Sequence, residues 1–565
     1  MDYRRIVLIG LLLLPLLAAC GQGGVTGTGG QPTSAAPAGA VTLRMLYGSE
    51  KQSWIAEATA AFNQAGIKTA AGQPIFVEAV PLGSGESLEA IASGAQQADI
   101  WSPASSIYLP LGNAAWAKNG NAGPLLDAAA APPLVLSPVV IAMWKPMAQA
   151  LGWPDKQIGW SDLAALATSG KTWADYGHRE WGAFQFGHTH PDYSNSGLAT
   201  IIALAYAGAK KTEGLSAADV QGPGAAALIS GVEQSVIHYG ASTGFFATKM
   251  FDEGPGYLSA AVLYENLVIE SYDQALHPNV DFPVVALYPA EGSFWSDHPF
   301  AILNTPGMTD EKRAAAALYR DYLLAPERQQ AALKFGFRPA NLNVPLAAPL
   351  DAAHGVDPTQ LTVALPVPPT EVIEAVRATW QQNKKQVDVA VVIDTSGSMR
   401  QEGRLKNAKD ALIGFLAAFA DQDRLGVTSF GSAAAELSPL TPLGPKRGEL
   451  QGRIENLIAD GNTRLYNTVA EAYAALSAEP AGQRIRALVV LSDGEDTADD
   501  MTIDQLLDVV GADAEGTSIK VFTIAYGSDA QLDVLERIAE ATGARAFAGD
   551  PATIKQVYAE IATFF

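Results

Sequence analysis

Residues 387–393 form a near-continuous, β-branched apolar run that stops abruptly at polar residues. A run of this kind predicts a strand buried on both faces, as in the centre of a parallel sheet. Directly after it, Asp394, Ser396 and Ser398 place three oxygen donors on one tight turn, and Gly397 lets that turn fold closely. Open α/β sheets bind their ligands at the carboxyl ends of the strands. The pattern therefore indicates the start of a metal site at a sheet edge.

The same alternation of apolar strands and amphipathic helices continues through the C-terminal part of the chain. Further strands are predicted at 424–430, 486–491, 519–526 and 545–547, and helices at 404–420, 449–459, 467–477, 503–510, 531–541 and 554–564. This alternation predicts a doubly wound, Rossmann-like α/β domain with a central parallel sheet over residues 386–565.

The N-terminal half also has an α/β pattern, in which apolar strands end in Ser- and Gly-rich turns that lead into helices. Such turns occur at residues 48–49, 81–87, 102–106 and 194–197. Serine hydroxyls and backbone N–H groups at a helix N-terminus can hold an anion without a cationic side chain. Serine is also a preferred N-cap, so simple helix capping is the alternative interpretation of each turn.

A short junction separates the two halves. A proline-rich stretch at 366–370 precedes a predicted helix at 371–385, which has Val376 and Trp380 on its apolar side. The helix runs almost directly into the strand at Val387, with no long flexible linker. We therefore expect the two halves to hold a restricted orientation.

The first residues have the pattern of a targeting signal. Arg4 and Arg5 precede an apolar run at 6–17 that is short for a membrane span but suits a signal peptide. The run ends in Leu-Ala-Ala-Cys20, which resembles the bacterial lipobox, so the Cys20 thiol is expected to carry a lipid anchor after cleavage of residues 1–20. An uncleaved anchor helix and an ordinary secretory signal are the alternatives. Residues 21–40 predict a flexible tether, which would hold the protein on the outer side of a bacterial membrane, at the cell surface or in the periplasm.

Composition narrows the classes of partner. The chain has 565 residues, 48% of them hydrophobic and 17% charged, which suits several globular domains. Its net charge of −22 argues against nucleic-acid binding and against electrostatic docking to anionic lipid. With a single cysteine, no intramolecular disulfide can form.

Residues 41–385 resemble the type 2 solute-binding proteins of ABC importers, in the sulfate/molybdate-like branch. The segments that carry the resemblance are 83–85, 98–105, 136–140, 194–197, 264–266, 288–292, 298–299 and 335–340. The resemblance implies a two-lobed, periplasmic-binding-protein-like domain, with hinge crossings near 137–140 and 299–303, that closes on a small solute. It also implies an ABC permease as a partner.

The resemblance further implies a set of solute contacts, which are Ser49, Ser84, Ser105, Ser196, Tyr264 and Glu265. This branch of the family implies an oxyanion as the solute. The carboxylate of Glu265 departs from that expectation, because it would disfavour a bare oxyanion. Glu265 would instead pair with a cationic part of a ligand or favour the start of its own helix.

Residues 386–565 resemble the von Willebrand factor A (VWA) domain. The metal-ion-dependent adhesion site of that family needs an Asp-x-Ser-x-Ser turn, a threonine and an aspartate on three loops. The matching residues here are Asp394, Ser396, Ser398, Thr463 and Asp493. All are hard oxygen donors and two are carboxylates, so Mg²⁺ is expected, with Mn²⁺ and Ca²⁺ as alternatives. The resemblance implies that a protein partner supplies an acidic side chain to one open coordination position.

Two other patterns are typical of sites of chemistry. His188 and His190 have the alternating spacing of a zinc-binding pair, but the sequence shows no third ligand. Residues 240–244 fit the Gly-x-Ser-x-Gly pattern of hydrolases around Ser242, but no partner histidine follows in the expected context. We therefore expect ordinary loop or cleft residues at both places, and no enzyme activity.

Together these features predict a surface-anchored, solute-binding lipoprotein whose VWA domain mediates metal-dependent protein interaction or adhesion. The alternative is a substrate-binding component of an ABC importer in which the VWA domain is only a scaffold.

Overall fold

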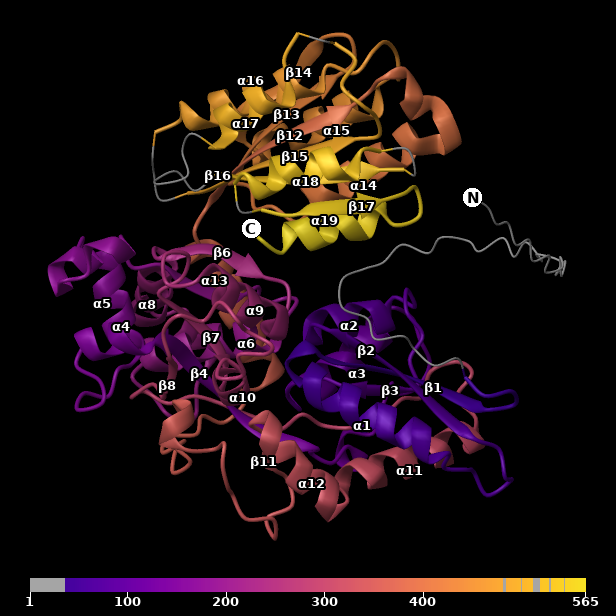
Figure 1. Ribbon diagram of the computed structural model, residues 1–565, viewed down its shortest axis with the longest axis vertical. Coiled ribbons are helices and arrows are strands. Elements are labelled where there is room, and N and C mark those ends of the chain that lie inside the picture. The colour runs from indigo at the N-terminus through magenta and orange to yellow at the C-terminus, as the bar shows by residue number, and fades with distance from the viewer. Residues whose placement is uncertain (1–35, 481–483, 499, 512–518, 528–529, 543) are drawn as a thin grey trace, which may run out of the picture.

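The computed structural model describes residues 36–480, 484–498, 500–511, 519–527, 530–542 and 544–565. These residues form three sheets, two in the N-terminal part of the chain and one in the C-terminal part (Figure 1). The predicted fold class, a two-lobed α/β domain followed by a doubly wound VWA-like domain, is confirmed. Cys20 and most of the predicted tether lie outside the described residues. Among the described helices, none is long and apolar enough to cross a membrane.

The first lobe is built on a sheet in the order β10-β3-β1-β2. Strand β1 pairs in parallel with β2 and β3, and β10 returns from later in the chain to run antiparallel to β3. Helices α1 and α11 pack on one face of this sheet, and α2 and α3 pack on the other. The elements are β1 (Val41–Gly48), α1 (Gln52–Ala65), β2 (Ile75–Leu82), α2 (Ser84–Ala92), β3 (Ile100–Ser102), α3 (Tyr108–Lys118), β10 (Ala301–Ile302), α11 (Asp310–Leu324) and α12 (Pro326–Ala332).

The second lobe is built on a mixed sheet in the order β11-β4-β7-β5-β6, with β8 and β9 also paired to β4. Its strands are β4 (Val135–Trp144), β5 (Phe186–Thr189), β6 (Val236–Gly240), β7 (Ala260–Tyr264), β8 (Val284–Leu287), β9 (Trp295–Ser296) and β11 (Arg338–Pro339). Its helices are α4 (Lys145–Ala150), α5 (Trp160–Thr168), α6 (Asn195–Gly208), α7 (Ala217–Val220), α8 (Pro223–Glu233), α9 (Thr243–Glu253), α10 (Glu265–Glu270) and α13 (Thr370–Asn383).

Two antiparallel segments carry the chain between the lobes. The N–H of Leu134 donates to the carbonyl of His298 (3.1 Å), and the N–H of Phe300 donates to the carbonyl of Pro132 (2.9 Å). The first crossing thus lies just before residues 137–140, and the second overlaps the start of 299–303. A third crossing leads from α12 in the first lobe to β11 in the second.

The C-terminal domain has a sheet in the order β14-β13-β12-β15-β16-β17, parallel except for β14. Helices α16, α17 and α18 cover one face, and α14, α15 and α19 cover the other. The strands are β12 (Val387–Asp394), β13 (Arg424–Phe430), β14 (Ala434–Pro442), β15 (Ile485–Ser492), β16 (Ile519–Tyr526) and β17 (Ala546–Gly549). The helices are α14 (Arg404–Leu416), α15 (Arg447–Glu455), α16 (Leu465–Ser477), α17 (Ile503–Gly511), α18 (Leu532–Glu540) and α19 (Ile554–Ala562).

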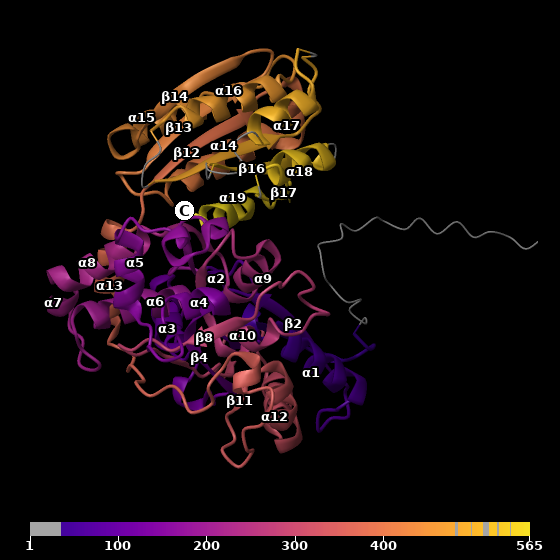
Figure 2. The same cartoon turned by 60° about the vertical axis from the view of Figure 1, so that its left-hand side comes forward.

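Helix α13 joins the second lobe to the C-terminal domain. Its Trp380 is fully buried, and the indole N–H donates to the Glu233 carboxylate (2.7 Å) in the second lobe. Only residues 384–386 separate α13 from β12, and Lys385 Nζ donates to the carbonyl of Val236 (3.0 Å). One cluster of buried apolar residues continues from the second lobe into the C-terminal domain. Figure 2 shows the C-terminal domain next to the second lobe.

Candidate metal site and solute cleft

The predicted metal-site residues lie together at the carboxyl edge of the C-terminal sheet. Strand β12 ends at Asp394, and its neighbour β15 ends at Ser492, directly before Asp493. The amino ends of β15 and β16 face the second lobe, so the opposite edge, with the candidate site, points away from the N-terminal domain (Figures 1 and 2).

A chain of short hydrogen bonds links four of the oxygen donors and their neighbour Ser492. Asp394 accepts from the N–H of Ser396 and from the hydroxyl of Ser492, both at 2.7 Å. The hydroxyls of Ser396 and Ser398 are 2.9 Å apart, and Ser398 donates to Asp493 Oδ1 at 2.7 Å. The donors that the sequence places on separate loops therefore meet in one cluster.

Thr463 reaches the same cluster from the loop before α16. A Cβ atom added to Gly494 would lie 3.7 Å from Thr463 Oγ1 and 3.9 Å from Ser398 Oγ. The backbone N–H of Thr463 donates to the hydroxyl of Thr497 (2.9 Å), and the N–H of Thr497 donates back to the carbonyl of Thr463 (2.8 Å). This pair of bonds holds the threonine beside the loop that carries Asp493.

The two carboxylates of the cluster differ in their charge environment. Burial raises the pKa of Asp394 to about 6, although hydrogen bonds from Ser396 and Ser492 act in the opposite direction. Asp493 instead forms a buried ion pair, in which Arg404 donates to Oδ2 at 3.0 Å. A cation from the chain therefore already faces Asp493, whereas hydroxyl and backbone N–H groups face Asp394.

Arg404 was not identified from the sequence, where it is only the first residue of a predicted helix. One signal was present, because a cation at a helix N-terminus is unfavourable with respect to the helix dipole. Arg404 begins α14 and is 1% exposed, so its position has a cost that the bond to Asp493 offsets.

The donor set suits a hard divalent cation. It consists of carboxylate and hydroxyl oxygens, which are the protein ligands that Mg²⁺ prefers. Among the described residues, no group of three or more His, Cys, Asp or Glu side chains could hold a metal.

The predicted solute contacts lie where the two lobes face each other, at the carboxyl ends of β1, β2 and β3 and at the starts of α6 and α10. All six are buried, and they are Ser49, Ser84, Ser105, Ser196, Tyr264 and Glu265. Their polar atoms bond mainly within the protein. Ser84 accepts from the N–H of Ala104 (2.9 Å), Ser105 accepts from Ile107 (3.3 Å), and Tyr264 accepts from Asn195 (3.0 Å).

Hydrogen bonds between the lobes hold the cleft closed. Ser49 of the first lobe donates to the hydroxyl of Ser242 in the second (2.9 Å) and accepts from the N–H of Gly244 (3.0 Å). At the start of α2, the N–H of Gly85 donates to the carbonyl of Tyr193 (2.8 Å). Glycine is required there, because a Cβ would lie 1.9 Å from the carbonyl oxygen of Asp192. An anion could bind the α2 N-terminus only after the carbonyl of Tyr193 moves away from the N–H of Gly85.

Glu265 is engaged by the protein itself. Its two carboxylate oxygens accept from Arg338 at 2.8 and 2.7 Å, and the hydroxyl of Tyr288 donates to it as well, at 2.5 Å. The carboxylate is fully buried and has a bidentate cationic partner, which a ligand would have to displace. In the closed cleft, Glu265 therefore connects α10 to β11, and its charge is balanced without a ligand.

A second buried group of charges lies in the cleft and was not identified from the sequence. Lys51 Nζ is 2.6 Å from Glu50 Oε1 and 3.2 Å from His298 Nδ1, and all three side chains are almost fully buried. Burial alone would raise the pKa of Glu50, but Lys51 and His298 hold it at about 2. Burial, reinforced by the charge of Lys51, lowers the pKa of His298.

Several polar atoms near the cleft lack a partner. Within the described part of the chain, Ser102 Oγ, Tyr108 OH and His298 Nε2 are buried and make no hydrogen bond. Ser102 ends β3 at the edge that carries Ser49, and the His298 ring lies 5.8 Å from that of Tyr264. Buried polar groups in native proteins are normally satisfied by protein or ordered water, so these atoms can accept hydrogen bonds from, or donate them to, water or a ligand.

The residues of the possible zinc pair and of the hydrolase-like pattern have partners within the protein. His188 Nε2 is 3.0 Å from Glu233, and His190 accepts from the backbone N–H of Asp192 (3.2 Å). Ser242 accepts from Ser49 across the cleft, as described above.

Comparison with known proteins agrees with this architecture. Residues 43–338, more than half of the chain, match the model for bacterial extracellular solute-binding proteins, and residues 388–560 match the model for the von Willebrand factor type A domain. No curated protein matches the chain.

Similar solved structures fall into the same two groups. A periplasmic thiamin binding protein is 14% identical over 62% of this chain and 100% of its own, with a TM-score of 0.44. A ferric binding protein from Campylobacter jejuni is 15% identical over 60% of this chain and 98% of its own, with a TM-score of 0.40. A von Willebrand factor type A protein from Catenulispora acidiphila is 21% identical over 32% of this chain, which spans 42% of that protein, with a TM-score of 0.29. The chain therefore belongs to the bacterial extracellular solute-binding proteins and carries a C-terminal VWA domain.

Proposed function

We propose that this protein is a lipid-anchored surface receptor that binds a small solute in the cleft and a protein partner through a metal ion on the VWA domain. The observation that carries the proposal is the cluster of oxygen donors around Asp394, Ser398 and Asp493 at the free edge of the VWA sheet. That edge faces away from the solute-binding domain, so a macromolecule can approach it (Figure 1).

The residues that would hold Mg²⁺ are Asp394, Ser396, Ser398, Thr463 and Asp493. When bound, the ion supplies a positive charge that attracts an acidic side chain of the partner. Asp394 is the carboxylate that gains most from the ion, because burial raises its pKa and its bonding partners are neutral. The hydroxyl and carboxylate groups of the site bond to one another, and this arrangement suits recognition of a partner through the ion.

The cleft suits a small polar solute. Its buried carboxylates are already paired, Glu50 with Lys51 and Glu265 with Arg338, so the ligand has no unbalanced charge to neutralise. Buried hydroxyl and imidazole atoms such as Tyr108 OH and His298 Nε2 offer hydrogen bonds to it. Binding of an oxyanion, or delivery of the solute to an ABC permease, stays a prediction from the sequence resemblance.

A thermal-shift titration tests the metal site. Mg²⁺ is expected to raise the melting temperature of the wild-type chain, because a ligand that binds only the folded state stabilises it. Asp394→Ala should abolish this rise, whereas Asp508→Ala, which removes an exposed carboxylate elsewhere in the domain, should preserve it. An Asp394→Ala variant that responds fully to Mg²⁺ would exclude the site.

The same variants separate the two proposed functions. A solute that stabilises the wild type should stabilise Asp394→Ala equally, because its cleft is intact. Immobilised wild-type protein should bind a candidate partner with MgCl₂ and lose it on addition of EDTA. If the partner stays bound in EDTA, the VWA domain is a scaffold or binds by another surface.

A further inference from the structure

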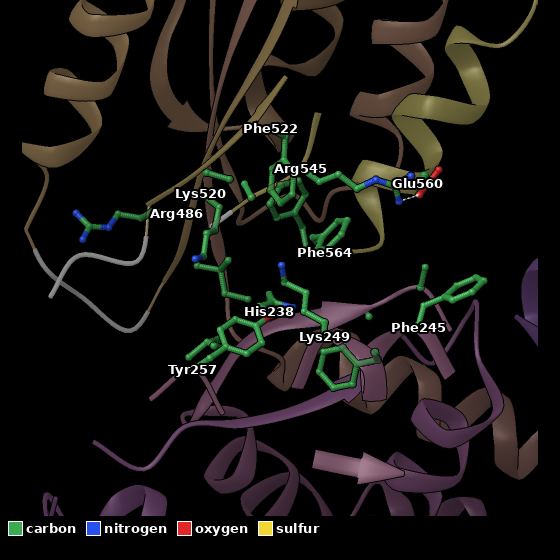
Figure 3. A pocket seen from close by; sticks show the side chains of 18 residues that line it. His238, Phe245, Lys249, Tyr257, Arg486, Lys520, Phe522, Arg545, Glu560 and Phe564 are labelled. Carbon is green, nitrogen blue, oxygen red and sulfur yellow. Dashed lines mark hydrogen bonds and ion pairs between the residues drawn. The ribbon is translucent and has the colours of Figure 1, made fainter. Parts of the chain in front are cut away.

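A cavity lies between the second lobe and the VWA domain (Figure 3). It is separate from the metal site, and its wall includes Ala241 and Phe245, which flank the segment that bonds to Ser49 in the cleft. The second lobe contributes β6 and α9 to its wall, and the VWA domain contributes the amino ends of β15 and β16 together with the end of α19. Neither domain alone encloses this space. Anything that binds in it would contact both domains at once.

The wall of the cavity is mainly aromatic. Phe246 and Tyr257 line it from the second lobe, and Phe522 and Phe564 line it from the VWA domain. The Phe522 and Phe564 rings are 4.7 Å apart, and the His238 ring lies 5.6 Å from Phe246 and 5.9 Å from Phe564. At the mouth, Phe245 is 52% exposed. This surface favours a flat apolar ligand.

The size of the cavity restricts that ligand. Its volume is about 160 Å³. An apolar protein cavity of about 150 Å³ is large enough to hold benzene. The cavity therefore has room for one six-membered ring with a small substituent.

Two lysines give the cavity its charge. Lys249 extends into the cavity from α9, and Lys520 extends into it from β16 on the opposite side (Figure 3). Their ammonium groups lie 5.5 and 5.9 Å from the centroid of the same Tyr257 ring. Burial lowers the pKa of Lys520, and the charge of Lys249 lowers it further. Like charges that face each other across an interface are unfavourable, and an anion between them would remove that cost.

Among the described residues that line the cavity, the remaining charged groups do not reverse this sign. Glu253 lies 3.6 Å from Lys249 on the same helix, and Arg545 pairs with Glu560 at 3.0 Å. Arg486 donates to the carbonyl of Leu476 (3.4 Å), away from the aromatic wall. His238 is neutral, because burial lowers its pKa to about 3. The cavity thus combines an aromatic surface with two ammonium groups that contact it from opposite domains.

We propose that this cavity binds a one-ring aromatic monocarboxylate, with the ring among Phe246, Phe522 and Phe564 and the carboxylate between Lys249 and Lys520. The ligand would join the two domains, because each supplies one lysine and part of the aromatic wall. This inference does not depend on the solute cleft or on the metal site.

Calorimetric titration of the full chain with benzoate tests the proposal, with benzamide as an uncharged ligand of the same shape. Benzoate should bind at least about tenfold more tightly than benzamide, because hydrogen bonds to charged groups contribute more than neutral ones. Equal affinity for the two ligands, or no binding of benzoate, would overturn the proposal.

Variants locate the binding. Lys249→Met and Lys520→Met keep the apolar stems and remove the charges, and each should weaken benzoate binding by about tenfold with little effect on benzamide. Ala544→Leu, at the cavity wall, should weaken both ligands by filling the space. Lys446→Met, at an exposed site distant from the cavity, is the control for lost charge and should change nothing. If both cavity lysine variants bind benzoate as the wild type does, the ligand binds elsewhere.

Discussion

Two buried carboxylates, Glu50 in the solute cleft and Asp394 in the VWA domain, have opposite electrostatic environments. Lys51 and His298 hold the pKa of Glu50 at about 2 despite its burial. Burial raises the pKa of Asp394 to about 6, and its hydrogen-bond partners are the neutral groups of Ser396 and Ser492. The cleft therefore contains its own counter-charges, whereas the VWA site leaves one carboxylate without a cation from the chain.

This contrast separates two kinds of binding site. A cleft with balanced charges can close on itself without a ligand, as the bonds from Ser49 to the second lobe show. A site with an unbalanced buried carboxylate is stabilised by an external cation. The difference leads to the four predictions below.

The largest expected effect tests whether Glu265 belongs to the architecture of the cleft. Arg338→Met should lower the free energy of unfolding of the solute-binding domain by about 3–5 kcal/mol, because it leaves a buried carboxylate without its partner. The double variant Arg338→Met/Glu265→Leu should recover most of this loss. Urea unfolding followed by tryptophan fluorescence measures both. A loss below about 1 kcal/mol in the single variant would mean that Glu265 is free to serve as a ligand contact.

The next prediction concerns acid stability. Since the pKa of Glu50 is about 2 in the folded state and 4.5 when unperturbed, its contribution is present above pH 4.5 and is lost as the pH falls towards 2. Between pH 4.5 and pH 3 this loss is about 2 kcal/mol. Urea unfolding at several pH values should show a shallower pH dependence for Glu50→Gln than for the wild type. Glu57→Gln, at an exposed carboxylate, should retain the wild-type slope.

A third prediction tests the role of Arg404. In Arg404→Met, no guanidinium competes for Asp493, so the dissociation constant for Mg²⁺ should fall by about tenfold, the equivalent of one charge-assisted hydrogen bond. Arg400→Met removes a nearby exposed cation that pairs with Asp460, and should change the affinity less than about twofold. Isothermal titration with MgCl₂ distinguishes the two. Weaker Mg²⁺ binding in Arg404→Met would show that the arginine organises the site instead.

The smallest effect concerns closure of the cleft. Ser242→Ala removes one hydrogen bond between the lobes, worth about 1 kcal/mol, so the open form should gain about fivefold in population. Small-angle scattering of the solute-free protein should show a larger radius of gyration. Thr248→Ala, in the helix that Ser242 precedes, removes a bond to the carbonyl of Gly244 within the same lobe and should scatter as the wild type does. Identical scattering for Ser242→Ala would mean that other contacts keep the lobes closed.

The sequence could predict that these oxygen donors lie together, because the geometry of the cluster is mostly local. The turn from Asp394 to Ser398 follows a strand whose apolar run is unmistakable, and the parallel sheet brings Asp493 to the same edge. The prediction did not include Arg404, because nothing in its spacing shows that its side chain turns back to Asp493.

The cleft was predicted less completely, because its contacts join residues far apart in the chain. The sequence identified Glu265 but not Arg338 or Tyr288, which supply its hydrogen bonds. It predicted that the start of α2 could hold an anion, with helix capping as the alternative, but could not show that the carbonyl of Tyr193 would occupy the N–H groups there. Hydrogen bonds between residues so far apart in the chain depend on how the lobes pack. The spacing of hydrophobic residues along the sequence does not show that packing.

The direct join between α13 and β12 also determines how the protein would respond to force. If a partner bound at the Asp394 edge were pulled, the force would be transmitted along β12 to α13. Helix α13 is held in the second lobe by Trp380, which donates to Glu233. Strand β12 lies between β13 and β15 and has hydrogen bonds on both sides. A force along β12 acts on the hydrogen bonds to both neighbouring strands at the same time. These bonds would have to break together, and not one after another as at the edge of a sheet. Under the proposed function, this central position of β12 would help the VWA domain to resist unfolding by a pulling force.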